Sequence, residues 1–219
     1  MKKWMLTLVI GLTIMMLAAC TDPHNQAAES MYEHLEASVE LESEFHEAQS
    51  ELVELEQQEN DLYLEMIEVN MDELDEIEET ADQALSIVEE RRQLMEVEMD
   101  SIDAAKEEFD EIEGYLDDLN ESAGEVANDM ISTKEDRYQA FVELYESYQT
   151  SLDRDEELYN MLKDEDLEKE TLDEQVELVN ESYDEISAAQ ETFNEYTNEF
   201  NDLKRQFYEA AELEVEFVE

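Results

Sequence analysis

Proline, glycine and cysteine are nearly absent from this chain of 219 residues, which contains one proline, three glycines and one cysteine. The sequence has no Asn-Gly or Asp-Gly pair and no sustained alternation of polar and apolar residues, so it gives no signal for β-hairpins or sheets. A lone cysteine cannot form a disulfide within the chain. The fold must therefore be held by packing alone.

Basic residues are also scarce, because 12 Lys and Arg face 66 Asp and Glu, for a net charge of −54. A chain so acidic is a poor candidate for nucleic-acid binding, which needs a basic surface. Self-repulsion on this scale can also indicate disorder. However, 42% of the residues are hydrophobic and they recur periodically, which predicts a folded chain with a solvated acidic surface.

The sequence lacks the motifs of common enzymes. It has no G-x-S-x-G, no glycine-rich phosphate loop and no H-E-x-x-H. Pairs of carboxylates are frequent, but 66 acidic residues make chance pairs inevitable. Charge runs are usually solvated helix faces. We therefore predict a protein that is not an enzyme and that needs no cofactor.

One short apolar stretch near the start of the chain carries a targeting signal. Lys2 and Lys3 precede the apolar residues 5–16, and the stretch ends in Leu17-Ala18-Ala19-Cys20. The stretch is too short to span a bilayer, and a basic start, an apolar centre and small residues before a cleavage point are typical of a secretory signal. The leucine and two alanines before a cysteine are typical of a bacterial lipobox.

We therefore predict a lipoprotein signal peptide over residues 1–19 and a diacylglyceryl group on Cys20, with Leu17, Ala18 and Ala19 as the lipobox. Two acyl chains give stable membrane attachment. The polar residues 21–30 would then be a tether, and residues 31–219 a single domain. This places the protein at the outer face of the cytoplasmic membrane, facing the cell wall.

The rest of the chain is rich in helix-forming residues, and its apolar residues mostly step by three and four. The longest series departs from this spacing once, where Arg91 lies between Val88 and Met95. That series consists of Leu74, Ile77, Ala81, Ala84, Val88, Met95, Met99, Ile102, Ala105, Phe109, Ile112, Leu116 and Leu119. Similar series over 138–162 and 172–207, and a weaker one over 31–67, predict further amphipathic helices.

We expect about four long helices, at 28–69, 71–119, 125–163 and 168–212. Asn120 and the neighbouring glycines interrupt the apolar repeat, and so does the charged run 163–169, in which Asp164 or Asp166 could cap the next helix. Near Asn70 the chain could turn or continue with a kink. The economical fold is all-α, an elongated antiparallel helical bundle. A long parallel dimer is a weaker alternative.

Two features could bind ligands, and each has a plainer interpretation. His34 and His46 lie among glutamates, and His46 could pair with Glu42, but we interpret both as ordinary exposed histidines. The aromatic residues Tyr138, Phe141, Tyr145 and Tyr148 could stack on sugars, but their spacing is also that of a buried core. We therefore predict no specific metal site, although Ca²⁺ or Mg²⁺ could associate diffusely with the carboxylates.

Several stretches resemble the YkyA-type family of cell-wall-binding lipoproteins of Gram-positive bacteria. The stretches are 31–45 (MYEHLEASVELESEF), 55–67, 101–109, 137–167 and 182–213, together with the lipobox. The chain departs from the family in charge, since it has few lysines. The resemblance implies an all-α lipoprotein outside the cell with no enzymatic activity, and it supplies no catalytic residue.

The main functional hypothesis is a non-enzymatic, lipid-anchored helical protein that associates with the cell wall or with an envelope protein. One alternative is a scaffold or adaptor that pairs with another coiled coil, which apolar residues outside the main series, such as Val53, Leu64, Val69 and Leu178, would favour. A second alternative is a lipoprotein that binds a metal or a small solute in a cleft between helices.

Overall fold

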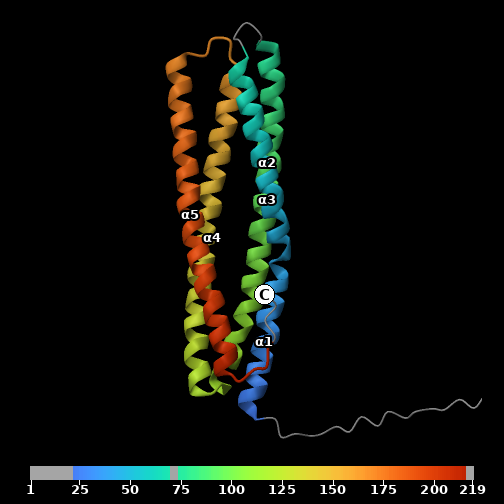
Figure 1. Cartoon of the computed structure of the whole chain (residues 1–219), viewed down its shortest axis with the longest axis vertical. Helices are drawn as coiled ribbons and strands as arrows, with labels where there is room; N and C mark the ends of the chain where they lie inside the picture. The colour runs from blue at the N-terminus through green and yellow to red at the C-terminus, as the bar shows by residue number, and fades with distance from the viewer. Residues whose placement is uncertain (1–21, 70–73, 216–219) are drawn as a thin grey trace, which may run out of the picture.

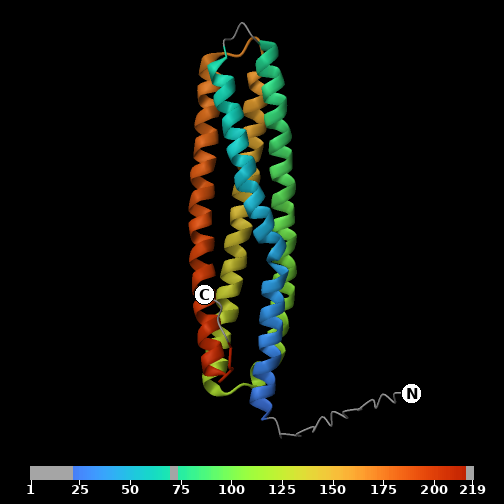
Figure 2. The same ribbon diagram turned by 45° about the vertical axis from the view of Figure 1, so that its right-hand side comes forward.

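The computed structural model of the chain describes residues 22–69 and 74–215, and these residues form a long, narrow rod of helices (Figures 1 and 2). Its elements are α1 (Pro23–Leu41), α2 (Ser43–Glu68), α3 (Leu74–Asp110), the 3₁₀ helix η2 (Glu111–Asp118), α4 (Glu121–Leu162) and α5 (Lys169–Ala210). α1 and α2 follow one another along the rod and together act as the first long helix. The predicted all-α bundle of four long helices is confirmed.

The four helices run up and down the rod. α2 packs along α3, α3 packs on α4, and α4 packs along α5. The chain therefore turns back between α2 and α3, and the alternative of a straight continuation is wrong, although Asn70 itself lies outside the described residues. The chain buries its apolar faces as a single antiparallel bundle, so a partner helix is not needed for that purpose.

The breaks at Asn120 and after Leu162 follow the sequence signals, whereas the break at Glu42 between α1 and α2 was not predicted. Asn120 caps α4, because its side-chain oxygen accepts a hydrogen bond of 2.9 Å from the Ala123 amide. The break after Leu162 is confirmed, but the predicted caps are not. Residue Glu168 precedes α5 and makes no side-chain cap, whereas Asp164 accepts a hydrogen bond from the Asp166 amide within the turn.

The start of the first helix differs from the prediction. α1 begins at Pro23, and the Asp22 side chain caps it by accepting a hydrogen bond of 3.2 Å from the His24 amide. Proline is well suited to the first position of a helix because its missing N–H would be unpaired there anyway. Ala27 and Ala28 are buried. Most of the segment expected to be a tether is therefore part of the bundle.

The core is a continuous apolar column in three parts. At the end of the rod where α1 starts, α1, α3, η2, α4 and α5 meet around Met31, Leu35, Phe109, Ile112, Met130 and Phe207. The middle is aromatic, with Phe45, Phe141 and Phe193 in edge contacts. The far end contains smaller residues, including Ala81, Ala84 and Val88. None of the described helices is both long and apolar enough to cross a membrane.

The aromatic stripe on α4 belongs to this column. Phe141 is fully buried, Tyr148 is 6% exposed, and Tyr138 and Tyr145 are partly buried. The interpretation as core, rather than as a sugar-binding surface, is confirmed for these residues.

Candidate functional site

Arg91 is the centre of a buried polar cluster in the far half of the rod. The residue occupies a position where the α3 series would otherwise place an apolar side chain, and its side chain is fully buried. Because the guanidinium stays charged under all ordinary conditions, it must be surrounded by acceptors. The neighbouring helices supply them: Glu59 from α2, Tyr148 and Asp155 from α4, and Tyr183 from α5.

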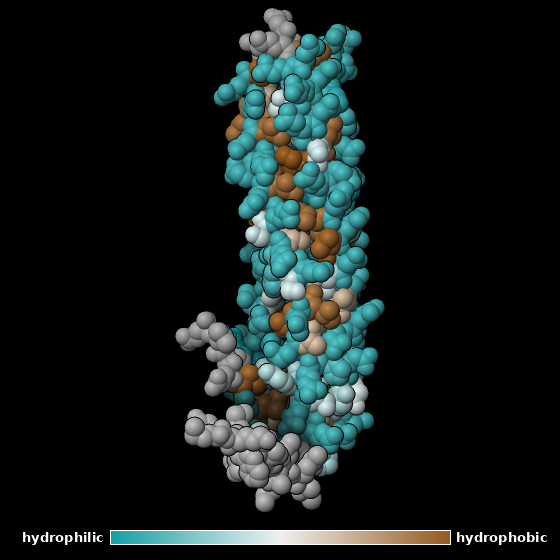
Figure 3. All heavy atoms as spheres, turned by 90° about the vertical axis from the view of Figure 1, so that its right-hand side faces the viewer, coloured by the Kyte–Doolittle hydropathy of each residue, from teal (hydrophilic) through white to brown (hydrophobic). Residues whose placement is uncertain are grey.

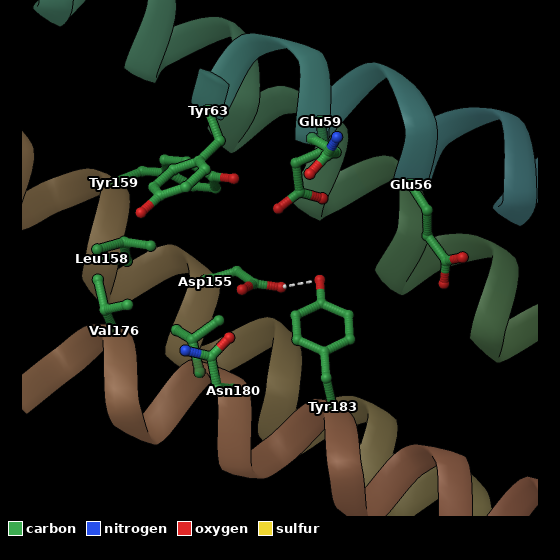
Figure 4. A pocket seen from close by; sticks show the side chains of 11 residues that line it. Glu56, Glu59, Tyr63, Asp155, Leu158, Tyr159, Val176, Asn180 and Tyr183 are labelled. Carbon is green, nitrogen blue, oxygen red and sulfur yellow. Dashed lines mark hydrogen bonds between the residues drawn. The ribbon is translucent and has the colours of Figure 1, made fainter. Parts of the chain in front are cut away.

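All three side-chain nitrogen atoms of Arg91 donate hydrogen bonds. Nε and Nη2 donate to the Tyr148 hydroxyl at 3.1 and 2.9 Å. Nη1 donates to Glu59 Oε2 at 2.5 Å and to Asp155 Oδ2 at 3.3 Å. The Tyr183 hydroxyl donates to the same Asp155 oxygen at 3.0 Å, as Figure 4 shows. One cation thus links three helices to α3 in a region from which water is largely excluded.

The cluster contains more carboxyl groups than cations. Burial, and to a lesser extent the nearby Glu59, raise the pKa of Asp155 to about 7, although Arg91 acts in the opposite direction. A third carboxylate, Glu56, lies 3.7 Å from Arg91 Nη2 and accepts a hydrogen bond of 2.6 Å from the Tyr148 hydroxyl. The region around Arg91 is therefore negative overall, and Asp155 exchanges its proton near neutral pH.

A groove opens above this cluster, between α2 and α5. One cavity of about 330 Å³ lies towards the far end of the rod, and its walls are shown in Figure 4. α2 contributes Glu56, Glu59, Asn60 and Tyr63; α4 contributes Asp155, Leu158 and Tyr159; α5 contributes Val176, Val179, Asn180 and Tyr183. The size is within the range of small-molecule pockets, and carboxylates, amides and tyrosine rings converge on it.

A second cavity of about 270 Å³ continues the groove towards the middle of the rod. Glu56 and Tyr183 line both cavities. The second cavity also reaches the carboxyl group of Glu98 on α3, which is 3% exposed. Burial raises the pKa of Glu98 to about 8, and the charge of Glu56 adds to the shift.

Another buried ion cluster lies at the junction of α1 and α2. Glu42, the residue between the two helices, binds Arg137 through two hydrogen bonds of 2.8 Å and Lys134 through one of 2.9 Å. Burial alone would raise the pKa of Glu42, but the two cations hold it below its usual value. Arg137 also lies over the ring of Phe193. In this cluster two cations share one carboxylate, and the contacts fix the junction to α4.

The sequence predictions for sites have different outcomes. Leu17, Ala18, Ala19 and Cys20 lie outside the described residues, so the lipobox stays a prediction. The interpretation of both histidines as ordinary exposed residues is wrong for His34, which is half-buried with Nδ1 2.7 Å from Glu108 Oε1, whereas His46 is exposed. Glu42 does not pair with the side chain of His46, because Lys134 and Arg137 occupy its carboxylate. Across the two described ranges, no group of three or more His, Cys, Asp or Glu is arranged to hold a metal ion.

The groove was not predicted from the sequence, and Arg91 was the only visible sign of it. A basic residue inside an apolar series is unusual in a chain with so few cations. Its partners could not be identified, because acidic residues and tyrosines are common on every helix. The groove offers carboxylates, amides and aromatic rings to a ligand, which suits cationic or hydroxyl-rich groups.

Comparisons with known proteins found one matching family, one relative in sequence and one solved structure with a similar fold. A model of the YkyA family, described as "Putative cell-wall binding lipoprotein", matches residues 26–210. A protein of Bacillus subtilis (strain 168) called "Uncharacterized lipoprotein YkyA" is 34% identical over 188 residues, which cover 84% of this chain and 82% of the relative. A crystal structure of a conserved Staphylococcus aureus protein of unknown function has the same fold. Its TM-score is 0.73 at 12% identity, with 82% of this chain and 91% of that chain covered.

Proposed function

Because the chain belongs to the YkyA family of lipoproteins, we propose that it is a non-enzymatic protein anchored through lipid on Cys20 at the outer face of the cytoplasmic membrane, where it associates with the cell wall. The observation that carries the proposal is the family match over residues 26–210 in a chain whose start reads Leu17-Ala18-Ala19-Cys20. A lipoprotein of this kind would act by holding a binding surface at a fixed place in the envelope.

The length of the rod determines how far the groove would lie from a lipid anchor on Cys20. α1 starts at Pro23, two residues after Thr21, so a lipid on Cys20 would hold that end of the rod close to the membrane. α4 starts at the same end, and Asp155 in the groove lies about 50 Å along it at 1.5 Å per residue. The bundle would thus hold the groove well above the lipid surface, within the wall.

The charge of the chain limits what it can bind in the wall. Wall teichoic acids are anionic, and a protein with a net charge of −54 is repelled by them at short range. Association therefore requires neutral glycan, a cationic protein or bridging divalent ions. Binding of the Cys20→Ser chain to purified sacculi, with and without EDTA, separates these cases. Loss of binding in EDTA supports bridging ions, unchanged binding rejects them, and no binding at all rejects wall association.

The anchor is tested separately, by fractionation of cells that express the native chain or Cys20→Ser. The native chain should sediment with membranes, and the variant should be released if it matures, since electrostatics alone would not keep it at an anionic surface. A matured variant, cleaved of its signal segment, that stays with the membrane fraction would reject anchoring through Cys20.

Exposed apolar residues favour a scaffold or adaptor as a second candidate. Val53 is 61% exposed and Ile67 57% exposed, and Leu64 lies between them in sequence on α2. Figure 3 shows apolar side chains interrupting the polar surface of one face along much of the rod. Leu178 is also exposed, whereas Val69 is partly covered. Crosslinking from position 53 in living cells, followed by mass spectrometry, would identify a partner helix on this face.

A further inference from the structure

Glu98 is a buried carboxyl group that lacks a partner. Its side chain is 3% exposed, and its Oε1 atom makes no hydrogen bond within the described residues. The other buried carboxylates of the described residues have cation partners: Glu42 binds Lys134 and Arg137, whereas Glu59 and Asp155 bind Arg91. Leaving a buried carboxyl unpaired destabilises a protein, so such a group needs an explanation.

The surroundings of Glu98 form a small cavity with apolar and polar walls. Leu52, Met95, Leu144 and Ile186 form the apolar part, and Tyr148 and Tyr183 also line the cavity. The uncharged polar lining residues are Gln49, Ser187 and Gln190. At about 270 Å³ it is slightly smaller than common small-molecule pockets, which hold about 300–1,000 Å³. The space is sufficient for one unbranched side chain but not for a whole disaccharide.

The charges at the cavity are unbalanced. Glu56 on α2 lines the same cavity, its side chain is 39% exposed, and its proximity raises the pKa of Glu98. The other titratable groups at the cavity are Tyr148 from α4 and Tyr183 from α5, which are neutral near pH 7. Arg91, on the same helix as Glu98, is already saturated by its own partners. The cavity therefore lacks a positive charge.

We propose that this cavity binds a primary ammonium group carried at the end of a short apolar chain, with Glu98 and Glu56 as its two carboxyl partners. The apolar walls would cover the methylene groups, and the tyrosine rings would favour a cation next to them. An organic cation fits better than a metal ion, because only two carboxyl groups reach the cavity, and in the described residues no three or more His, Cys, Asp or Glu are arranged to hold a metal. The proposal concerns this cavity alone and does not depend on wall association.

Binding should release a proton. Glu98 is mostly protonated near pH 7 in the free protein, because its pKa is about 8. An ammonium ion beside it favours the ionised carboxylate, so the proton leaves for the buffer as the ligand enters. The affinity should consequently rise about 25-fold between pH 6.5 and pH 8.5, as the fraction of ionised Glu98 rises.

The test uses titration calorimetry of the Cys20→Ser chain in 0.3 M NaCl, which screens diffuse attraction to the acidic surface. The probe is Nα-acetyl-lysine amide, and the control ligand is Nα-acetyl-norleucine amide, which has a similar shape and no charge. We expect saturable binding of one equivalent of the lysine probe, no binding of the norleucine control, and proton release measured by comparing two buffers of different ionisation enthalpy.

The matched variants are Glu98→Gln and Glu96→Gln, which remove one carboxylate each from the same helix, Glu96 being exposed. Glu98→Gln should weaken binding at least tenfold and abolish proton release, whereas Glu96→Gln should behave as the native chain. Val53→Trp, at an exposed position that lines the cavity, should weaken binding without disturbing the core. Equal affinities in the two glutamine variants, equal binding of both ligands, or no binding would each overturn the proposal.

Discussion

Replacing Arg91 by methionine would test whether the polar cluster holds the far half of the rod together. The substitution keeps most of the volume but leaves Glu59 and Asp155, each 3% exposed, without their cation. Removing one partner of a buried ion pair destabilises proteins by about 3–5 kcal/mol. That is a large share of the stability of an ordinary domain, which is about 5–15 kcal/mol.

The assay is urea unfolding at pH 8, followed by the helical circular dichroism signal, for the native chain and the variant. Arg92→Met is the matched control: the next residue along α3 is 23% exposed and pairs with exposed Asp153 and Glu156. Surface ion pairs contribute about 0–1 kcal/mol. A triple variant that replaces Arg91, Glu59 and Asp155 by apolar residues should recover most of the loss, because it leaves no unpaired charge.

The pH dependence of the variant gives an independent check. Arg91 is one of the groups that lower the pKa of Asp155, so the pKa should rise further without it. A carboxyl whose pKa is higher in the folded state stabilises the fold at low pH and loses that contribution as pH rises. Arg91→Met should therefore recover stability between pH 8 and pH 5.5. If Arg91→Met and Arg92→Met lose similar amounts, or if acid brings no recovery, the cluster is not the buried network described above.

Two further predictions concern the other buried carboxyls. The native chain should lose stability as pH rises from 5 to 8, because Glu98 has a folded pKa of about 8 against 4.5 in the unfolded chain. Glu98→Gln should reduce that loss by roughly 3 kcal/mol in urea unfolding, and an unchanged slope would contradict the burial of Glu98. Glu42→Gln should destabilise the bundle by about 3 kcal/mol, since Lys134 and Arg137 would lose their carboxylate. Thermal unfolding at pH 7 measures this effect, and a loss as small as that of an exposed Glu195→Gln control would refute it.

The helices could be predicted because their signal is local. An apolar residue at every third or fourth position requires a helix with one buried face, and Met31, Ile102 and Phe207 are buried as that spacing predicts. The turns near Asn120 and Lys163 were also visible in the composition. The start of α1 was missed because residues 23–30 are polar or small, and their burial depends on neighbours far away in the sequence.

The polar clusters could not be predicted, because their partners are distant in sequence and common in type. Arg91 contacts residues 32 to 92 positions away, on three other helices. The break at Glu42 carries no glycine or proline, and its partners lie on other helices. Lys134 and Arg137 on α4 bind the Glu42 carboxylate, and the Ser101 hydroxyl on α3 donates to the Leu41 carbonyl and accepts from the Phe45 amide. In a chain with 66 acidic residues, nothing local distinguishes Glu42, Glu59 or Glu98 from the solvated majority.

The apolar core alone does not fix how far each helix is displaced along its neighbours, and the polar clusters can do so. Long helices with repeating apolar faces can slide past one another by about one heptad and still bury similar surface. A shift of α2 or α4 relative to α3 would separate Arg91 from Glu59 or Asp155, and would bury those charges unpaired. Glu42 would likewise lose Arg137 if α1 moved relative to α4. We infer that the buried ions fix the register of the bundle. The groove between α2 and α5 depends on that register, because α2 forms one wall, α4 and α5 form the other, and Arg91 links the two walls beneath it.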